Sequence, residues 1–223
     1  MATARDSLPA AERLRIAETF LSLQGEALAA GLPTFFIRLS GCPLRCQYCD
    51  TAYAFHGGQW YGIDALVAAA TASCAPAVCV TGGEPLAQPA CLGLLTALCD
   101  AGLDVSIETS GAFPIGEIDE RVVRVVDLKT PGSGEESRND WNNIGELRSS
   151  DVVKFVICDR ADFDWASEIV ATHHLSARCA VFFSPSFEQL AATTLADWLV
   201  SAPQRVRLQL QLHKLLWSDE PGR

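Results

Sequence analysis

The chain has 223 residues, of which 49% are apolar, and a formal net charge of -10. This size supports one sizeable hydrophobic core, so we expect a single domain over residues 1–223. No apolar run reaches the roughly 18 residues of a membrane-spanning helix, and a negative charge without a basic stripe disfavours a nucleic-acid partner.

The N-terminal stretch, MATARDSLPAAERLRIAETF, lacks the apolar segment of a secretory signal, so we expect a cytoplasmic protein. Beyond it, short apolar runs alternate with helical segments. The strand candidates are residues 34–39, 77–80, 105–108, 122–127, 152–157, 180–183 and 206–210. The helix candidates are residues 64–73, 89–101, 161–172 and 187–200. Most of the strand candidates are continuously apolar, which is typical of parallel strands covered on both faces.

This alternation predicts an α/β fold with a parallel sheet. An irregular segment at residues 129–146 uses up part of the length, and a closed barrel of eight βα units typically takes ~250 residues. We therefore predict a partial, open TIM-like barrel of about six βα units. Ligands of such sheets bind at the carboxyl ends of the strands.

Three cysteines lie directly after the first of these strand candidates, in the segment GCPLRCQYCDT: Cys42, Cys46 and Cys49. Disulfides use cysteines in pairs, and a closed zinc site needs four ligands. Thiolates with sulfide suit iron, and a four-iron cluster held by three cysteines leaves one iron open for a small molecule. The alternatives are a zinc site completed by a distant histidine such as His56, or three unrelated thiols. We interpret the six other cysteines as small buried hydrophobic residues: Cys74, Cys79, Cys91, Cys99, Cys158 and Cys179.

The C-x3-C-x2-C spacing, with Tyr48 before the last cysteine, resembles the radical S-adenosylmethionine (SAM) superfamily and its core fold. The resemblance implies that the open iron binds SAM and that Tyr48 packs near the adenine. The TGGEP segment at residues 81–85 resembles the GGE motif of that superfamily, which implies cofactor contacts for Gly83 and Glu84. The ETSG segment at residues 108–111 resembles its ribose-binding region, which implies contacts for Glu108 and Ser110. Taken alone, these two segments are an ordinary turn and a polar strand end.

Four further stretches narrow the resemblance: LQGE at residues 23–26, Arg38, CDT at residues 49–51 and QLQLHK at residues 209–214. Together they resemble the 7-carboxy-7-deazaguanine synthase family from about residue 18 to residue 214. The resemblance implies a carbon–nitrogen lyase of queuosine biosynthesis. It would convert 6-carboxy-5,6,7,8-tetrahydropterin into 7-carboxy-7-deazaguanine with loss of ammonia. It also implies a 4Fe-4S cluster, SAM and Mg2+ as cofactors, a homodimer, and flavodoxin or ferredoxin as the electron donor.

The same resemblance assigns roles to matching positions. Arg38 would hold the substrate carboxylate, unless it forms a structural ion pair, and Thr51 would bind Mg2+. Glu108 and His213 would be candidate catalytic groups for proton transfer, although a buried, hydrogen-bonded histidine is the alternative for His213. The other implied substrate contacts are Leu23, Gln24, Gly25, Glu26 and Thr81. The other implied cofactor contacts are Cys49, Asp50, Asp127, Leu128, Lys129, Ser184, Pro185, Ser186 and Phe187.

The chain departs from the family pattern at one position, because Ala27 stands where the family has the last glycine of LQGEG. If this position takes a positive φ, alanine strains the loop. Two other functions stay open at this stage. A glycyl-radical-enzyme activase would use the same cluster, but LQGE and CDT favour the synthase. A non-catalytic iron–sulfur or zinc binding protein needs no second ligand pocket, which TGGEP and ETSG indicate.

Overall fold

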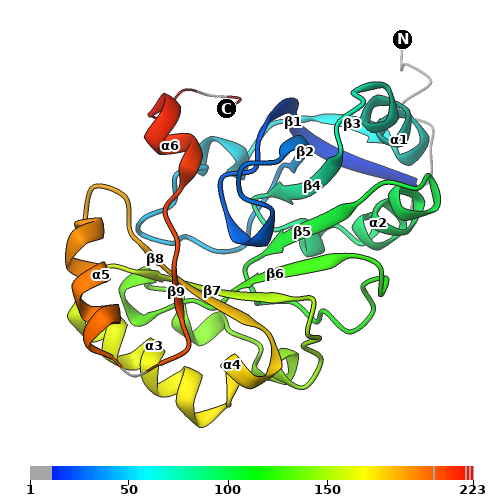
Figure 1. Cartoon of the computed structure of the whole chain (residues 1–223). Helices are drawn as coiled ribbons and strands as arrows, with labels where there is room; N and C mark the ends of the chain where they lie inside the picture. The colour runs from blue at the N-terminus through cyan, green and yellow to red at the C-terminus, as the bar shows by residue number, and fades with distance from the viewer. Residues whose placement is uncertain (1–11, 203, 219, 221, 223) are drawn as a thin grey trace.

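A computed structural model of the chain describes residues 12–202, 204–218, 220 and 222 (Figure 1). Its described residues form one nine-stranded sheet in the order β3-β1-β2-β4-β5-β6-β7-β8-β9. The strands are β1 Arg13–Leu23, β2 Pro33–Leu39, β3 Gln59–Gly62, β4 Ala77–Gly82, β5 Val105–Thr109, β6 Val123–Asp127, β7 Val152–Ile157, β8 Ala180–Pro185 and β9 Arg207–Leu208. From β2 and β4 through β9, neighbouring strands pair in parallel. The sheet is open, which confirms the predicted partial barrel.

The helices are α1 Ile63–Ala72, α2 Ala90–Asp100, α3 Arg160–Thr172, α4 Leu175–Arg178, α5 Ala192–Ser201 and α6 Leu212–Trp217. The 3-10 turns are Ala27–Ala29, Ala52–Phe55, Pro85–Ala87, Pro131–Ser133, Glu136–Arg138 and Trp141–Ile144. In Figure 1, α1 and α2 lie beside one end of the sheet and α3, α4 and α5 beside the other. Helix α6, drawn in red, lies apart from them near the loop after β2, and Lys214 of α6 contacts Asp50 of that loop.

Two strands of the sheet, β1 and β3, were not predicted. Strand β1 pairs antiparallel with β2 and with β3, so the two missed strands extend the parallel sheet at one edge. Leu14 and Ile16 of β1 are buried while Arg15 between them is exposed. This alternation is typical of a strand with one solvated face, whereas the predicted strands have the continuously apolar pattern of buried parallel strands. The helix predicted over residues 187–200 was wrong at its start, because α5 begins at Ala192.

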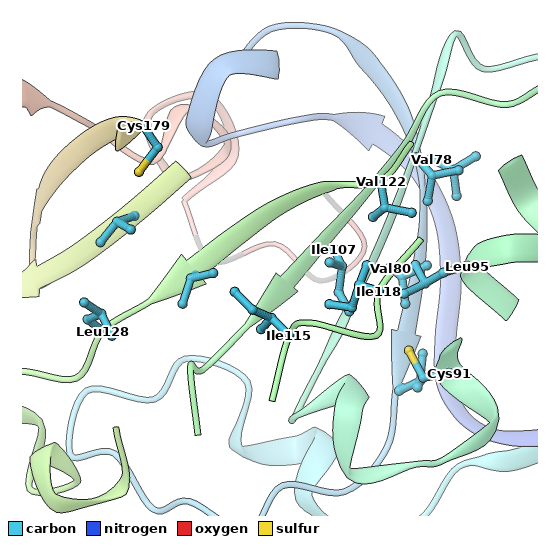
Figure 2. Packing of buried hydrophobic residues seen from close by; sticks show 14 of the residues in the cluster. Val78, Val80, Cys91, Leu95, Ile107, Ile115, Ile118, Val122, Leu128 and Cys179 are labelled. Carbon is cyan, nitrogen blue, oxygen red and sulfur yellow. The ribbon is translucent and has the colours of Figure 1, made fainter. Parts of the chain in front are cut away.

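The hydrophobic core lies between the sheet and the helices α1, α2, α3 and α5. In Figure 2, Cys91 and Leu95 of α2 lie close to Val80 of β4. Five of the six cysteines outside the cluster segment are buried, as predicted. The prediction was wrong for Cys74, which is exposed. It lies in the turn between α1 and β4, with a φ of 53°.

The irregular segment predicted at residues 129–146 is confirmed as a series of 3-10 turns. It is anchored where it starts. The Lys129 amide donates to Asn139 Oδ1 at 2.8 Å, and Asn139 Nδ2 donates back to the Lys129 carbonyl at 2.9 Å. This pair of bonds fixes the backbone just beyond the end of β6, although no regular element follows.

Among the described residues, no helix has both the length and the apolar character that spanning a membrane requires. Residues 1–11, which contribute to the expectation of a cytoplasmic protein, lie outside the described part of the chain.

Candidate active site

A cavity of about 740 Å³ opens at the carboxyl ends of the parallel strands. Its size lies within the range of ~300–1,000 Å³ that is usual for small-molecule sites. The walls come from the loop after β1, the loop after β2, the ends of β4 through β8, and α6. Every predicted site residue lines this cavity except Glu84 and Leu128. Residues up to 190 positions apart in sequence therefore meet where the parallel sheet predicts that they should.

The three cysteines of the loop after β2 reach one end of the cavity. Gly41, with a φ of 98°, turns the chain into the loop, and the buried Leu44 anchors it from below. Burial raises the pKa of the Cys46 thiol to about 11 and also raises that of Cys42. In the described residues, no three His, Cys, Asp or Glu side chains are grouped for a single metal ion. Thiolates that each bind a different iron of a cluster do not have to meet at one point, so the loop is compatible with 4Fe-4S.

The surroundings of this loop fit a cofactor such as SAM. The hydroxyl of Tyr48 and Oδ1 of Asp127 are buried, and neither has a hydrogen-bond partner among the described residues. Buried polar groups normally have partners, so both atoms suit a polar ligand. Gly83 packs so closely on the loop that a Cβ there would lie 2.2 Å from the Gly41 oxygen and 2.8 Å from Cys42 Cβ. The end of β4 is thus pressed against the thiol loop.

Glu84 and Leu128 face away from the cavity. The Glu84 carboxylate is fully buried and accepts hydrogen bonds from the Leu86 amide at 2.9 Å, from the Ser110 amide at 2.7 Å, and from the Thr109 and Ser110 hydroxyls. It therefore ties the end of β4 to the end of β5. Its implied cofactor contact stays a prediction. Leu128 packs in the core (Figure 2), and its amide donates to the Lys154 carbonyl at 2.9 Å.

Glu108 also lines the cavity and is held by two side chains. Gln24 Nε2 donates to its Oε1 at 3.3 Å, and the Thr81 hydroxyl donates to its Oε2 at 3.0 Å. Burial raises the pKa of Glu108, and the nearby charge of Glu26 raises it further. Glu108 is therefore suited to hold a proton at a pH where an exposed glutamate is ionised.

Arg38 lines the cavity and also forms the ion pair that the sequence left as its alternative. Its Nε lies 2.8 Å from Glu18 Oε1, and the Tyr53 hydroxyl donates to the same oxygen at 2.7 Å. The guanidinium also stands over the Phe20 ring, with Cζ 5.5 Å from the ring centroid. A contact through Nε leaves further N–H donors on the guanidinium that a ligand carboxylate could use.

The expectation about Ala27 is confirmed, because its φ is 58°. Its amide donates to Gln209 Oε1 at 2.6 Å. Nearby, His213 of α6 packs on the same loop, and a Cβ on Gly25 would lie 2.0 Å from His213 Nδ1. Burial lowers the pKa of His213, so the ring is mostly neutral near pH 7.

Sequence reasoning gave no role to several charged or polar residues of the cavity, among them Lys154, Gln211 and Lys214. Lys154 Nζ lies 2.6 Å from Glu26 Oε2, and Gln211 Nε2 donates to Glu26 Oε1 at 2.8 Å. Lys214 Nζ lies 3.0 Å from Asp50 Oδ2. Partial burial opposes the charge of Asp50, yet Lys214 lowers the pKa of this carboxyl below its usual value. A signal was available for Lys154, which is the one charged residue of the apolar segment VVKFVI.

Comparison with known proteins defines the class of protein first. The model of the Radical SAM superfamily matches residues 36–128, which include the thiol loop and the ends of β4, β5 and β6. Residues 36–128 therefore form a radical SAM domain, of the class that uses a 4Fe-4S cluster and SAM.

The particular family follows from curated relatives. A 7-carboxy-7-deazaguanine synthase of Chlorobaculum tepidum is 41% identical over 210 residues, which cover 93% of this chain and 96% of that protein. One of Koribacter versatilis is 39% identical over 223 residues, which cover 93% and 98%. The crystal structure of QueE from Escherichia coli matches the fold with a TM-score of 0.73 at 23% identity, over 96% of this chain and 100% of that one. The chain belongs to the 7-carboxy-7-deazaguanine synthase family.

Proposed function

We propose that this protein converts 6-carboxy-5,6,7,8-tetrahydropterin into 7-carboxy-7-deazaguanine with loss of ammonia. The observation that carries the proposal is that one cavity joins two kinds of wall. The three thiols form one group of lining residues, which we call the thiol end. Gln24, Glu26 and Arg38 form a second group, which suits a small polar ring with a carboxylate and which we call the substrate end. A non-catalytic metal carrier has no use for the second wall.

The cofactors have a place at the thiol end. Cys42, Cys46 and Cys49 would hold the 4Fe-4S cluster, and Tyr48 and Asp127 would contact SAM through their buried oxygens. When bound, the reduced cluster and SAM supply the one-electron chemistry that begins with abstraction of a substrate hydrogen atom. The further expected contacts on this wall are Asp50, Gly83, Ser110, Lys129, Ser184, Pro185, Ser186 and Phe187.

The other wall provides groups that match a pterin. The aminopyrimidinone edge of a pterin carries neighbouring N–H donors, and carboxylate or amide oxygens such as those of Glu26 and Gln24 accept them. Arg38 would bind the substrate carboxylate, since a guanidinium fork matches that planar group. Leu23, Gly25 and Thr81 complete this wall.

Loss of ammonia requires a proton at the departing nitrogen, and two groups of the cavity can move one. Glu108 holds its proton above the usual pH range of a glutamate because it is buried, so it can act as a donor. Burial lowers the pKa of His213, so its neutral ring can accept a proton. We assign proton transfer to this pair.

Mg2+ would bind at Thr51, beside the substrate carboxylate. The Thr51 hydroxyl lies 3.4 Å from Asp50 Oδ1, which gives the site a second oxygen. Mg2+ prefers oxygen ligands and keeps most of its waters, so few protein ligands suffice. Thr51→Val should weaken the Mg2+ dependence of turnover and leave the iron–sulfur spectrum unchanged. Thr71→Val, on the exposed face of α1, is the control; equal Mg2+ titrations in the two variants would exclude Thr51 as a ligand.

Two partners complete the proposal. The cluster receives its electron from a flavodoxin or a ferredoxin, and two copies of the chain form a homodimer. Reduction assays with each donor and sedimentation of the loaded protein test these statements separately. Absence of cluster reduction by both donors, or a sedimenting monomer, would contradict them.

The decisive experiment uses reduced, cluster-loaded protein with SAM, Mg2+ and the carboxypterin. Formation of 7-carboxy-7-deazaguanine and ammonia is the expected result. SAM cleavage that occurs only after a glycyl-radical enzyme is added would instead indicate an activase. No cleavage under any of these conditions would indicate an iron–sulfur protein without catalysis.

A further inference from the structure

Lys154 is a buried lysine, and a charged side chain in this position needs partners within the protein. It lies in the middle of β7, between buried apolar neighbours, and its side chain is 12% exposed. The strand register places it opposite Asp127 of β6 and Phe182 of β8. A buried ammonium is costly unless it is paired, so its partners define its role.

The chain has three lysines, and all three line the cavity: Lys129, Lys154 and Lys214. Each has a different main partner. Lys129 Nζ lies 2.8 Å from Asp127 Oδ2, and Lys214 pairs with Asp50. Lys154 lies 2.6 Å from Glu26 but 3.8 Å from Asp127 Oδ2. Lys129 thus serves the thiol end, whereas Lys154 mainly serves the end with Glu26.

The Glu26 carboxylate is fixed from both sides. Lys154 contacts Oε2, and Gln211 of α6 donates to Oε1. The Glu26 amide donates to Gln24 Oε1 at 3.2 Å, which ties the backbone to a second cavity residue. The carboxylate therefore has a defined orientation in the cavity, with lone pairs that two single contacts do not exhaust.

Two carboxylates of this cavity have pKa values that are shifted in opposite directions. Burial would raise the pKa of Glu26, but the charge and hydrogen bond of Lys154 and the hydrogen bond of Gln211 together lower this pKa. The pKa of Glu108 is raised by burial and by Glu26. Burial would lower the pKa of Lys154, and Glu26 and Asp127 instead raise it. The two shifts favour the anion at Glu26 and the protonated form at Glu108, an arrangement that is usual where two acidic groups have different tasks.

We propose that Lys154 is a positioning residue for substrate recognition, which holds the Glu26 carboxylate in place to accept the paired N–H groups of an aminopyrimidinone ring. This inference rests on the proposed function, since it names how the same cavity recognises its pterin. Lys154 lies closer to Glu26 than to Asp127, so it acts through Glu26 on the substrate. Lys129 contacts Asp127, and it acts through Asp127 on the cofactor.

The test compares Lys154→Met with Lys129→Met in cluster-loaded protein. Two quantities are measured in each: the affinity for the carboxypterin, by calorimetry with SAM present, and the rate of SAM cleavage without substrate. Lys154→Met should lose roughly ten- to hundredfold in substrate affinity, because a buried carboxylate loses its partner, and should keep the cleavage rate. Lys129→Met should lower the rate of SAM cleavage and keep the affinity for the carboxypterin. Lys154→Arg should recover part of the affinity, since it keeps the charge.

Two further arms separate recognition from folding. A double-mutant cycle combines Glu26→Gln with Lys154→Met. The double variant should bind substrate at least as tightly as the single variant with the lower affinity, because the two side chains act through one contact. If Lys154→Met fails to load its cluster, this neutral pair and Lys154→Arg still decide the question. A carboxypterin analogue without the 2-amino group should bind weakly to wild-type protein and lose little more in Lys154→Met.

Unchanged substrate affinity in Lys154→Met would overturn the inference, as would fully additive losses with Glu26→Gln. Equal losses of affinity and of uncoupled SAM cleavage would overturn it too, because Lys154 would then serve Asp127 and the cofactor. Wild-type protein that neither binds nor converts the carboxypterin would overturn the proposed function itself. Active wild-type protein with an unaffected Lys154→Met variant would overturn only the role of Lys154.

Discussion

The two ends of the cavity differ in how their polar groups are satisfied. At the substrate end, the Glu26 and Glu108 carboxylates both have partners within the protein. At the thiol end, the Tyr48 hydroxyl and Asp127 Oδ1 are buried and without hydrogen-bond partners among the described residues. One end is organised before ligands arrive, and the other end has polar atoms that ligands would complete.

This difference has an energetic consequence. A buried polar group without a partner costs about 1–3 kcal/mol, so a cofactor that pairs such groups stabilises the folded state by mass action as well as by its own contacts. The substrate end gains less stability from its ligand because its carboxylates are already paired. The geometry there favours recognition, since fixed acceptors lose little entropy on binding. Variants that affect one end and spare the other test this difference.

The largest effect is expected at the thiols. Cys42→Ala, Cys46→Ala and Cys49→Ala should each abolish the iron–sulfur absorbance and SAM cleavage, because each removes one of three iron ligands. Cys74→Ala and Cys158→Ala are the controls, with loss of stability at most. Loss of the cluster in either control together with a retained cluster in Cys46→Ala would show that the ligand assignment is wrong.

A smaller but still large effect is expected for Gly83→Ala. The added methyl group would meet the Gly41 oxygen at 2.2 Å, so the thiol loop must shift. Such overpacking typically costs about 1–3 kcal/mol, and we expect lower iron content and weaker SAM binding while the substrate end keeps its contacts. Gly93→Ala in α2 is the matched control, since its nearest neighbour would be Ile63 Cδ1 at 3.4 Å. A Gly83→Ala variant with wild-type iron content and SAM affinity would refute the close packing.

Arg38→Ala tests the substrate end. Removal of a charge-assisted pair should reduce carboxypterin affinity by roughly ten- to hundredfold, and SAM cleavage without substrate should continue at the native rate. Arg38→Lys should recover only part of the carboxypterin affinity, because an ammonium lacks the planar fork of a guanidinium. Glu18→Gln separates the two roles of Arg38. If it reproduces the loss seen in Arg38→Ala, the ion pair with Glu18 matters more than a bond to the substrate.

The sequence predicted residues that line both ends of the cavity, but it did not predict the contacts between side chains at the substrate end. Motifs at the thiol end, such as C-x3-C-x2-C and TGGEP, are local, because one loop or one strand end carries all their residues. The parallel strands were predicted for a similar reason, since most of them are short, mainly apolar runs. Contacts at the substrate end span the chain. Lys154 and Glu26 are 128 positions apart, and Gln211 and Glu26 are 185 apart.

Such distant pairs depend on strand register and on how α6 returns to the cavity, and neither has a local signal. The antiparallel edge strand β1 was missed because only an alternating pattern marks it, and β3 was missed because its four residues are short and none is buried. Even a local motif can mislead about side-chain direction. Glu84 belongs to TGGEP, yet its carboxylate turns to Thr109 and Ser110 and not toward the cavity. The motif predicted where the backbone lies, and the side-chain contacts required the fold.

The smallest effect concerns the loop that carries Glu26. Ala27 adopts a φ of 58°, which is unfavourable for a residue with a Cβ by about 1–2 kcal/mol. Ala27→Gly removes this strain but adds about 0.5–1 kcal/mol of chain entropy to the cost of folding. The net expectation is a gain of up to about 1 kcal/mol in the free energy of unfolding, measured by chemical denaturation.

The bond from the residue 27 amide to Gln209 Oε1 uses the backbone, so it survives the change to glycine. Ala29→Gly, in the same 3-10 turn but with an ordinary φ, is the matched control and should lose about 0.5–1 kcal/mol. If contacts within the protein organise the substrate end, Ala27→Gly should keep the affinity for the carboxypterin, because Lys154 and Gln211 still hold Glu26. A fall in that affinity alongside a gain in stability would show that the strained alanine, and not the hydrogen bonds, orders this end of the cavity.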